Sequence, residues 1–160
     1  MLPEEILYQL LDTMPVARLG LIDDKKRPES LPIVFARVGG FLFSPIDGKP
    51  KSSTKLARIE HIKKEPKGSL LLDYYADDWE QLWWVKLDTE AQVVLDEHVS
   101  WGKAVSTLRD KYSQYREVSL FTGEPTMIAI RWTRVRWWAS DGLNGLNRWL
   151  DDHRLAKPIF

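Results

Sequence analysis

The chain has 160 residues and a mass of 18.6 kDa, with 44% hydrophobic residues and 23 basic side chains balanced by 23 acidic ones. This composition disfavours intrinsic disorder, and the length suffices for a single hydrophobic core. Zero net charge argues against binding of nucleic acid or anionic lipid through the overall charge of the protein. The absence of cysteine excludes disulfides, thiolate metal sites and cysteine nucleophiles.

The N-terminal segment gives no sign of membrane targeting. No stretch approaches the roughly 20 apolar residues of a membrane span, and the acidic start at Glu4 and Glu5 is unlike a signal peptide. We therefore expect one cytoplasmic domain over residues 1–160, with neither nucleic acid nor membrane as a partner. The eight tryptophans are unusual, and since indoles most often fill cores or dimer contacts, we expect most of them there.

The first part of the chain is predicted to form a helix followed by an antiparallel meander. A proline in the first turn and apolar residues at helical spacing predict a short helix over residues 3–12. Strands are expected over 16–22, 31–38 and 41–44, because a polar turn and a Gly-Gly pair separate them. Two tight turns so close together imply neighbouring antiparallel strands.

The rest of the chain alternates between helical and strand patterns. We expect a helix beginning near Ser53 and ending before Pro66, followed by strands over 70–75, 83–95 and 126–140, a helix over 96–112 and a C-terminal helix over 143–155. The inward parity of the last strand changes near Trp132, which predicts a β-bulge. Six or so antiparallel strands with helices in the connections indicate an α+β fold, a small barrel rather than a parallel sheet.

Side-chain catalysis finds little support. The sequence has no phosphate-binding P-loop and no serine nucleophile elbow, and its three histidines lie apart. The paired carboxylates Asp77-Asp78 and Asp151-Asp152 are more typical of turns and caps than of acid-base pairs. We therefore predict no catalytic side chain and no metal site.

One segment is rich in lysine and hydroxyl side chains. Residues 45–67 hold seven basic and three acidic residues, and the lysines at 49, 51 and 55 surround the expected helix start near Ser53. Because a helix N-terminus offers unpaired N–H groups and partial positive charge, this cluster could bind a phosphate. A solvated basic loop with an ordinary helix cap explains the same residues, and both readings stay open at this point.

Several short motifs together resemble the pyridoxamine 5'-phosphate oxidase-like family. They are Ala-Arg-Leu-Gly at 17–20, Leu-Pro-Ile-Val-Phe at 31–35, Leu-Phe-Ser at 42–44, Asp-Gly-Lys-Pro-Lys at 47–51, Lys-Leu-Ala-Arg-Ile at 55–59, Leu-Leu-Leu-Asp-Tyr-Tyr at 70–75 and Leu-Trp-Trp-Val at 82–85. The resemblance spans roughly residues 14–139 and is strongest to the small deazaflavin-dependent branch. It implies a six-stranded split β-barrel that forms a homodimer, with FMN, or alternatively the deazaflavin coenzyme F-420, in clefts at the subunit interface.

The resemblance also implies which residues contact the cofactor. The strand backbone of Leu31, Pro32, Ile33 and Val34 would run beside the ring, and Ser44 would lie near its polar edge. Trp138 would line the substrate side. The phosphate would be held by the cluster of lysines and hydroxyls, which consists of Lys49, Lys51, Ser53, Thr54 and Lys55. Thr54 stands where an arginine is common in the family. The C-terminal arginine and histidine of true pyridoxamine 5'-phosphate oxidases have no counterpart, so vitamin B6 oxidation is not expected.

Three functions are consistent with these residues. The first is an oxidoreductase that transfers hydride between the flavin-type cofactor and a small organic substrate, in which the cofactor supplies the chemistry and the protein supplies its position. The second is a non-catalytic carrier of flavin or haem with the same fold. The third is a cofactor-free dimer whose aromatic surface binds another protein.

Overall fold

The computed structural model describes residues 1–46 and 53–154, with residues 53–56 described by their backbone alone. The elements are α1 (Glu4–Thr13), β1 (Ala17–Ile22), β2 (Pro28–Ile33), β3 (Ala36–Val38), β4 (Phe41–Pro45), α2 (Ser53–Lys64), β5 (Lys67–Tyr74), the 3₁₀ turn η1 (Trp79–Gln81), β6 (Trp83–Val94), α3 (Trp101–Lys111), the 3₁₀ turn η2 (Ser113–Arg116), β7 (Met127–Ala139) and α4 (Gly142–Arg154). No helix among the described residues is long and apolar enough to cross a membrane.

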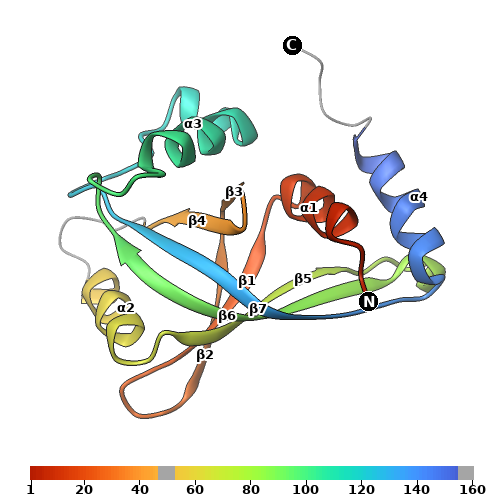
Figure 1. Cartoon of the computed structure of the whole chain (residues 1–160), viewed down its shortest axis with the longest axis horizontal. Coiled ribbons are helices and arrows are strands. Elements are labelled where there is room, and N and C mark those ends of the chain that lie inside the picture. The colour runs from red at the N-terminus through yellow and green to blue at the C-terminus, as the bar shows by residue number, and fades with distance from the viewer. Residues whose placement is uncertain (47–52, 155–160) are drawn as a thin grey trace.

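The strands form one antiparallel sheet in the order β2-β1-β5-β6-β7-β4-β3. The sheet curls into a half-barrel, with α1 and α3 over its concave side and α4 beyond one end (Figure 1). This is the α+β barrel that the strand pattern predicted.

The expected number of six strands is wrong, because the described chain has seven. The single strand expected over 31–38 is two strands, β2 and β3, which lie at opposite edges of the sheet. Between them Val34 and Phe35 carry the chain from one edge to the other. We call residues 33–36 the crossover; it ties the two edges together and so closes the curl of the sheet.

The core consists of two clusters of buried hydrophobic side chains. The larger cluster fills the barrel and includes the inward residues of β6, such as Val85 and Leu87, together with α1 and α4 residues such as Leu10 and Leu146. The smaller cluster lies under α3, around residues such as Leu108. Alternate residues of β6 point outward, as the period-two pattern predicted.

The β-bulge predicted near Trp132 is confirmed. Asp88 of β6 faces Arg134 of β7, but the next residue, Thr89, faces Trp132, so Thr133 is the extra residue. An extra residue in one strand reverses which side chains point inward beyond it. This explains why the two halves of β7 follow opposite parity.

The start predicted for the helix after β6 is wrong. Residues 96–100 form a turn instead, in which the His98 N–H donates to the Leu95 carbonyl and the Trp101 N–H donates to the His98 carbonyl, both at 3.0 Å. The His98 ring also accepts a hydrogen bond from the Ser100 N–H, at 3.1 Å. These local bonds satisfy backbone groups outside a helix, so α3 begins only at Trp101.

Candidate functional site

The crossover and the end of β4 lie side by side. In the pairing of β3 with β4, Ala36 faces Phe43, and extending this register by one residue places Phe35 opposite Ser44. Ser44 is 2% exposed. The structure therefore places Ser44 beside the crossover, which begins where the predicted ring-contacting segment 31–34 ends.

The predicted ring-contacting segment belongs to an edge strand. In the described sheet β2 pairs with β1 alone, so its other side presents backbone N–H and C=O groups that no strand covers. Along it Pro32 is exposed, Leu31 and Val34 are half-buried, and Ile33 is buried. Unpaired backbone donors and acceptors beside apolar side chains suit a flat heterocycle with polar atoms along its edge.

The predicted phosphate-binding cluster is described only in part. Lys49 and Lys51 lie outside the described residues, as do the side chains of Ser53, Thr54 and Lys55. The helix that follows does begin at Ser53, as expected. Figure 1 shows the first turn of α2 on the side of the sheet where β4 ends.

The position of α2 is set by its packing and its charges. Ile62 is buried in the barrel cluster and Ile59 packs against it. The charge of Glu29 on β2 lies near Arg58; burial lowers the pKa of the Arg58 guanidinium, and Glu29 opposes that shift. The His61 ring lies 3.6 Å from a Glu29 carboxylate oxygen. These contacts pack α2 against β1 and β6, with His61 and Arg58 near Glu29 of β2.

Tyr112, which the sequence analysis did not single out, holds the crossover in place. Its hydroxyl accepts a hydrogen bond from the Phe35 N–H at 3.0 Å, and lies within donating distance of the Pro15 carbonyl at 2.9 Å and the Phe35 carbonyl at 3.1 Å. Burial raises the pKa of the Tyr112 phenol to about 12. The neutral hydroxyl thus provides hydrogen-bond partners for backbone groups at the crossover that have no partner in the sheet.

Lys111 also holds the crossover in place. Its ammonium donates to the Leu11 carbonyl at 2.9 Å and lies 3.7 Å from the centroid of the Phe35 ring. The end of α3 thus contacts both the N-terminal helix and the crossover. Because Tyr112 and Phe35 are 77 residues apart in the chain, no local motif could have revealed the contact.

Trp138 lies far from Ser44, the residue predicted at the polar edge of the ring. It is ten residues along β7 from Ile128, the residue that faces Ser44, which is a separation of roughly 30 Å. Trp138 is 47% exposed and pairs across the ladder with Trp84, which is 37% exposed. The structure therefore does not bring Trp138 together with Ser44.

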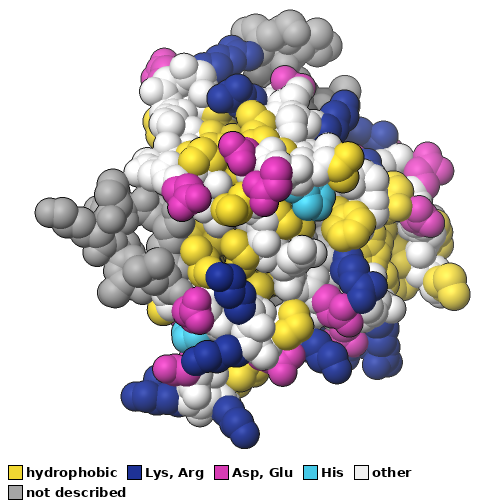
Figure 2. Space-filling model, turned by 60° about the vertical axis from the view of Figure 1, so that its left-hand side comes forward, with side chains coloured by type: hydrophobic (Ala, Val, Ile, Leu, Met, Phe, Trp, Pro, Cys, Tyr) yellow, Lys and Arg dark blue, Asp and Glu magenta, His cyan; other side chains and the backbone are white. Residues whose placement is uncertain are grey.

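The outer face of β6 and β7 continues from these tryptophans as a ladder of charges. Arg136 forms an ion pair with Asp88, and Arg131 forms one with Glu90. The face of the molecule drawn in Figure 2 likewise carries basic and acidic side chains interspersed with hydrophobic ones rather than separated by sign. Within residues 1–46 and 53–154, no group of His, Asp and Glu side chains is arranged to hold a metal ion.

Comparisons with solved structures identify this architecture. Over 85% of the chain, an FAD-binding protein from Mesorhizobium loti superposes with a TM-score of 0.61 and 18% identity, covering 92% of that protein. The chain has the split-barrel fold of the pyridoxamine 5'-phosphate oxidase-like proteins. A putative pyridoxamine 5'-phosphate oxidase from Listeria innocua matches 84% of the chain and 96% of its own length, with a TM-score of 0.59 and 17% identity.

Haem proteins share the fold as well. HutZ, a haem storage protein from Vibrio cholerae, matches 87% of the chain and 95% of its own length, with a TM-score of 0.62 and 12% identity. No protein-family model matches the sequence, and neither does any curated protein. At these identities the likeness establishes the fold alone, which an FAD-binding protein and a haem storage protein share.

Proposed function

We propose that this protein is an oxidoreductase that binds FMN or the deazaflavin coenzyme F-420 and transfers hydride between it and a small organic substrate. The observation that supports the proposal is the position of the buried Ser44 beside the crossover, which continues the edge strand β2. The flavin-binding protein of the same fold supports the choice of ligand.

In this proposal the residues of the chain bind and orient. The backbone of Leu31 to Val34 lines the ring, Ser44 lies at its polar edge, and the lysines and hydroxyls at the start of α2 neutralise the phosphate. The bound cofactor supplies hydride transfer, so an acid-base pair of side chains is not required. The missing counterpart of the substrate-phosphate segment argues for a substrate other than pyridoxamine 5'-phosphate.

The ligand itself is the first test. We expect the purified protein to carry a flavin or deazaflavin, visible in its absorption spectrum and identified by its mass after denaturation. If it purifies without ligand, we expect FMN or coenzyme F-420 to bind with micromolar affinity in a fluorescence titration. Absence of both a copurifying ligand and micromolar binding overturns the proposal.

The phosphate cluster gives a second test. Removing a charged donor to a phosphate costs about 1.5–3 kcal/mol, so Lys55→Ala should weaken cofactor binding by about 10- to 100-fold, and Lys51→Ala should act in the same direction. Lys64→Ala is the matched control, because Lys64 is an exposed lysine at the other end of the same helix. Equal affinities for all three variants contradict the assignment of the cluster.

A carrier without turnover is the alternative, favoured by the likeness to the haem storage protein HutZ. Titration with haem distinguishes the ligand class. Stopped-flow mixing distinguishes function: an enzyme reduced with NAD(P)H, or loaded with reduced deazaflavin, is reoxidised faster when its substrate is added, whereas a carrier shows no substrate-dependent reoxidation. Tight haem binding with no response to flavins favours the carrier.

We further propose a homodimer that pairs through the outer face around Trp84 and Trp138. Two half-exposed tryptophans side by side are typical of residues that dominate an interface, each contributing about 2 kcal/mol or more. Replacing both by glutamate should weaken dimerisation at least about 30-fold, measured by light scattering over a dilution series. Trp79→Glu is the control, because Trp79 is 68% exposed and lies on η1 instead.

A further inference from the structure

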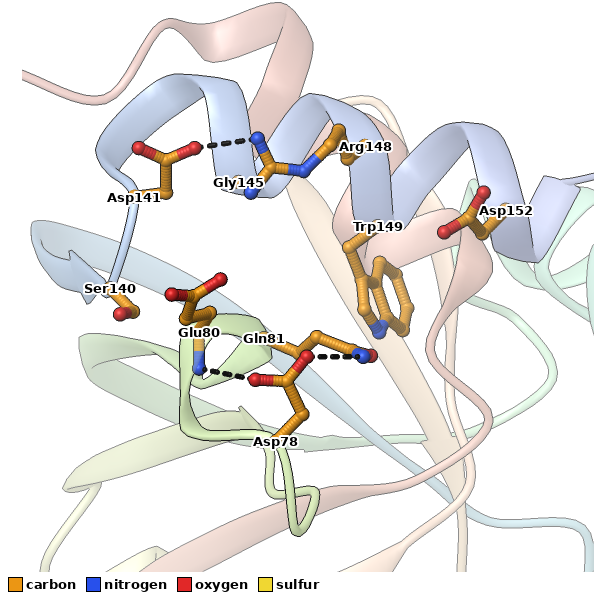
Figure 3. Close-up of a pocket in the computed structure, with 9 residues that line it drawn as sticks. All are labelled: Asp78, Glu80, Gln81, Ser140, Asp141, Gly145, Arg148, Trp149 and Asp152. Carbon is orange, nitrogen blue, oxygen red and sulfur yellow. Dashed lines mark hydrogen bonds and ion pairs between the residues drawn. The ribbon is translucent and has the colours of Figure 1, made fainter.

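A cavity lies between α4 and the turn η1, at the end of β7 away from Ser44. It measures about 520 Å³. Figure 3 shows residues of α4 on one side of it and Asp78, Glu80 and Gln81 on the other. Neither the flavin proposal nor the dimer proposal uses any of these residues.

The walls of the cavity carry an excess of negative charge. Four carboxylates line it, from Asp78, Glu80, Asp141 and Asp152, against the single guanidinium of Arg148. Arg148 is already paired with Asp141 at 2.5 Å, and Asp78 accepts hydrogen bonds from the Glu80 N–H and the Gln81 amide. Across residues 1–46 and 53–154, Glu80 and Asp152 have no ion-pair partner, and Figure 3 shows them on opposite sides of the space.

A buried hydrogen-bond donor also lies in the wall of this cavity, behind the Gln81 side chain. Trp149 is 6% exposed, and its indole N–H has no acceptor in the described part of the chain. Stacking on His153 at 4.0 Å and edge contact with Trp83 at 4.9 Å fix the ring, so the N–H cannot turn elsewhere. In Figure 3 the indole nitrogen points away from α4 toward the exposed Gln81 side chain, which a ligand can displace.

We propose that this cavity binds a small hydroxylated di- or polyamine. Its ammonium groups contact Glu80 and Asp152, and its hydroxyl oxygen accepts the hydrogen bond of the Trp149 indole. Carboxylates alone would attract any cation, but an unpaired buried N–H requires an acceptor, and one ligand that carries both groups satisfies both sides of the cavity. Amino sugars and amino cyclitols belong to this class and fit the volume.

Calorimetric titration of the whole 160-residue chain with three small probes tests the proposal. We expect 1,3-diamino-2-propanol to bind saturably, 1,3-diaminopropane to bind about fivefold more weakly because it lacks the hydroxyl, and glycerol not to bind. No saturable binding of the first probe, or equal binding of the two diamines, overturns the proposal. The proposal is also overturned if NaCl at matched ionic strength displaces the two diamines equally, because the site would then attract cations without selection.

Variants separate the two contacts. Asp152→Asn should weaken the binding of both diamines about three- to fivefold, whereas Asp151→Asn, on the same helix but outside the cavity, should leave it unchanged. Trp149→Phe should lose the preference for the hydroxylated diamine. If Trp149→Phe does not fold, Gln81→Ala serves instead, and it should keep or increase that preference by exposing the indole. Equal effects of both aspartate substitutions contradict the site, and flavin binding is unaffected by either outcome.

Discussion

The two hydrophobic clusters of this molecule differ in how they use polar groups. The barrel cluster is built from apolar side chains such as Leu19, Leu72 and Leu87, which are fully buried. The cluster under α3 includes Tyr112, whose hydroxyl binds the crossover backbone. The barrel cluster therefore stabilises the curl of the sheet, and the cluster under α3 also positions the segment where we propose the cofactor binds.

This difference separates stability from binding. A substitution in the barrel cluster should lower the free energy of unfolding and leave the affinity of the folded protein for its ligand almost unchanged. A substitution at Tyr112 should lower both. The polar contact, rather than the amount of buried apolar surface, then distinguishes the part of the core that serves the site.

The largest effect is expected from Leu87→Ala. Leu87 is 0% exposed on the inner side of β6, and truncating a buried leucine costs about 2–5 kcal/mol of unfolding free energy. Urea denaturation measures this loss. Gln92→Ala, an exposed outward position of the same strand, should cost less than about 0.5 kcal/mol. Similar losses for both variants would refute the inward and outward assignment of β6.

Tyr112→Phe should have a smaller effect on stability and a larger one on binding. The variant keeps the ring but leaves the Phe35 N–H and the Pro15 carbonyl without their partner, which costs about 1–3 kcal/mol. Because the crossover then loses a fixed point, cofactor affinity should fall as well. The control is Tyr75→Phe, at a position 70% exposed. A Tyr112→Phe protein that binds cofactor normally removes the positioning role from this cluster.

The same tyrosine predicts a pH dependence. Its pKa is about 12 in the folded protein, against the ordinary tyrosine value of 10.0 that applies to the unfolded chain. Above pH 10 the unfolded phenol loses its proton while the folded one keeps it, so this contribution to stability is complete below pH 10 and is lost as the pH rises to 12. The wild-type protein should lose about 2 kcal/mol relative to Tyr112→Phe over that interval. A constant difference between the two proteins contradicts the burial of the phenol.

Local patterns predicted the parts of the fold that depend on local order. Alternation along β6 indicated a long half-buried strand, and the parity change near Trp132 indicated the bulge, because each side chain's direction follows from its neighbours. The division of residues 31–38 could not be predicted this way. That segment has one continuous strand pattern, and only the assembled sheet places its two halves on opposite edges.

The candidate site likewise has residues that local patterns predicted and residues that only the assembled fold brings together. Ser44 and residues 31–34 were predicted from their motifs, whereas Tyr112 and the Trp149 cavity depend on contacts between segments far apart in the chain. Asp78 illustrates both sides. The adjacent carboxylates of Asp77 and Asp78 predicted a turn or a cap, and the Asp78 side chain does cap η1 by accepting a hydrogen bond from the Glu80 N–H. Its place in an acidic cavity arises only when α4 folds over that turn.

The smallest effect is expected on the outer face, where neither cluster reaches. Asp88 and Arg136 form an ion pair with both side chains more than a third exposed, so Asp88→Asn should cost less than about 1 kcal/mol, and less still in 0.5 M NaCl. Urea denaturation at low and high salt measures this difference. A loss above about 2 kcal/mol that persists in high salt would show that the charge ladder is shielded from solvent, as it would be beneath a second protomer. The outer face would then count as a third buried region, formed between subunits rather than within one.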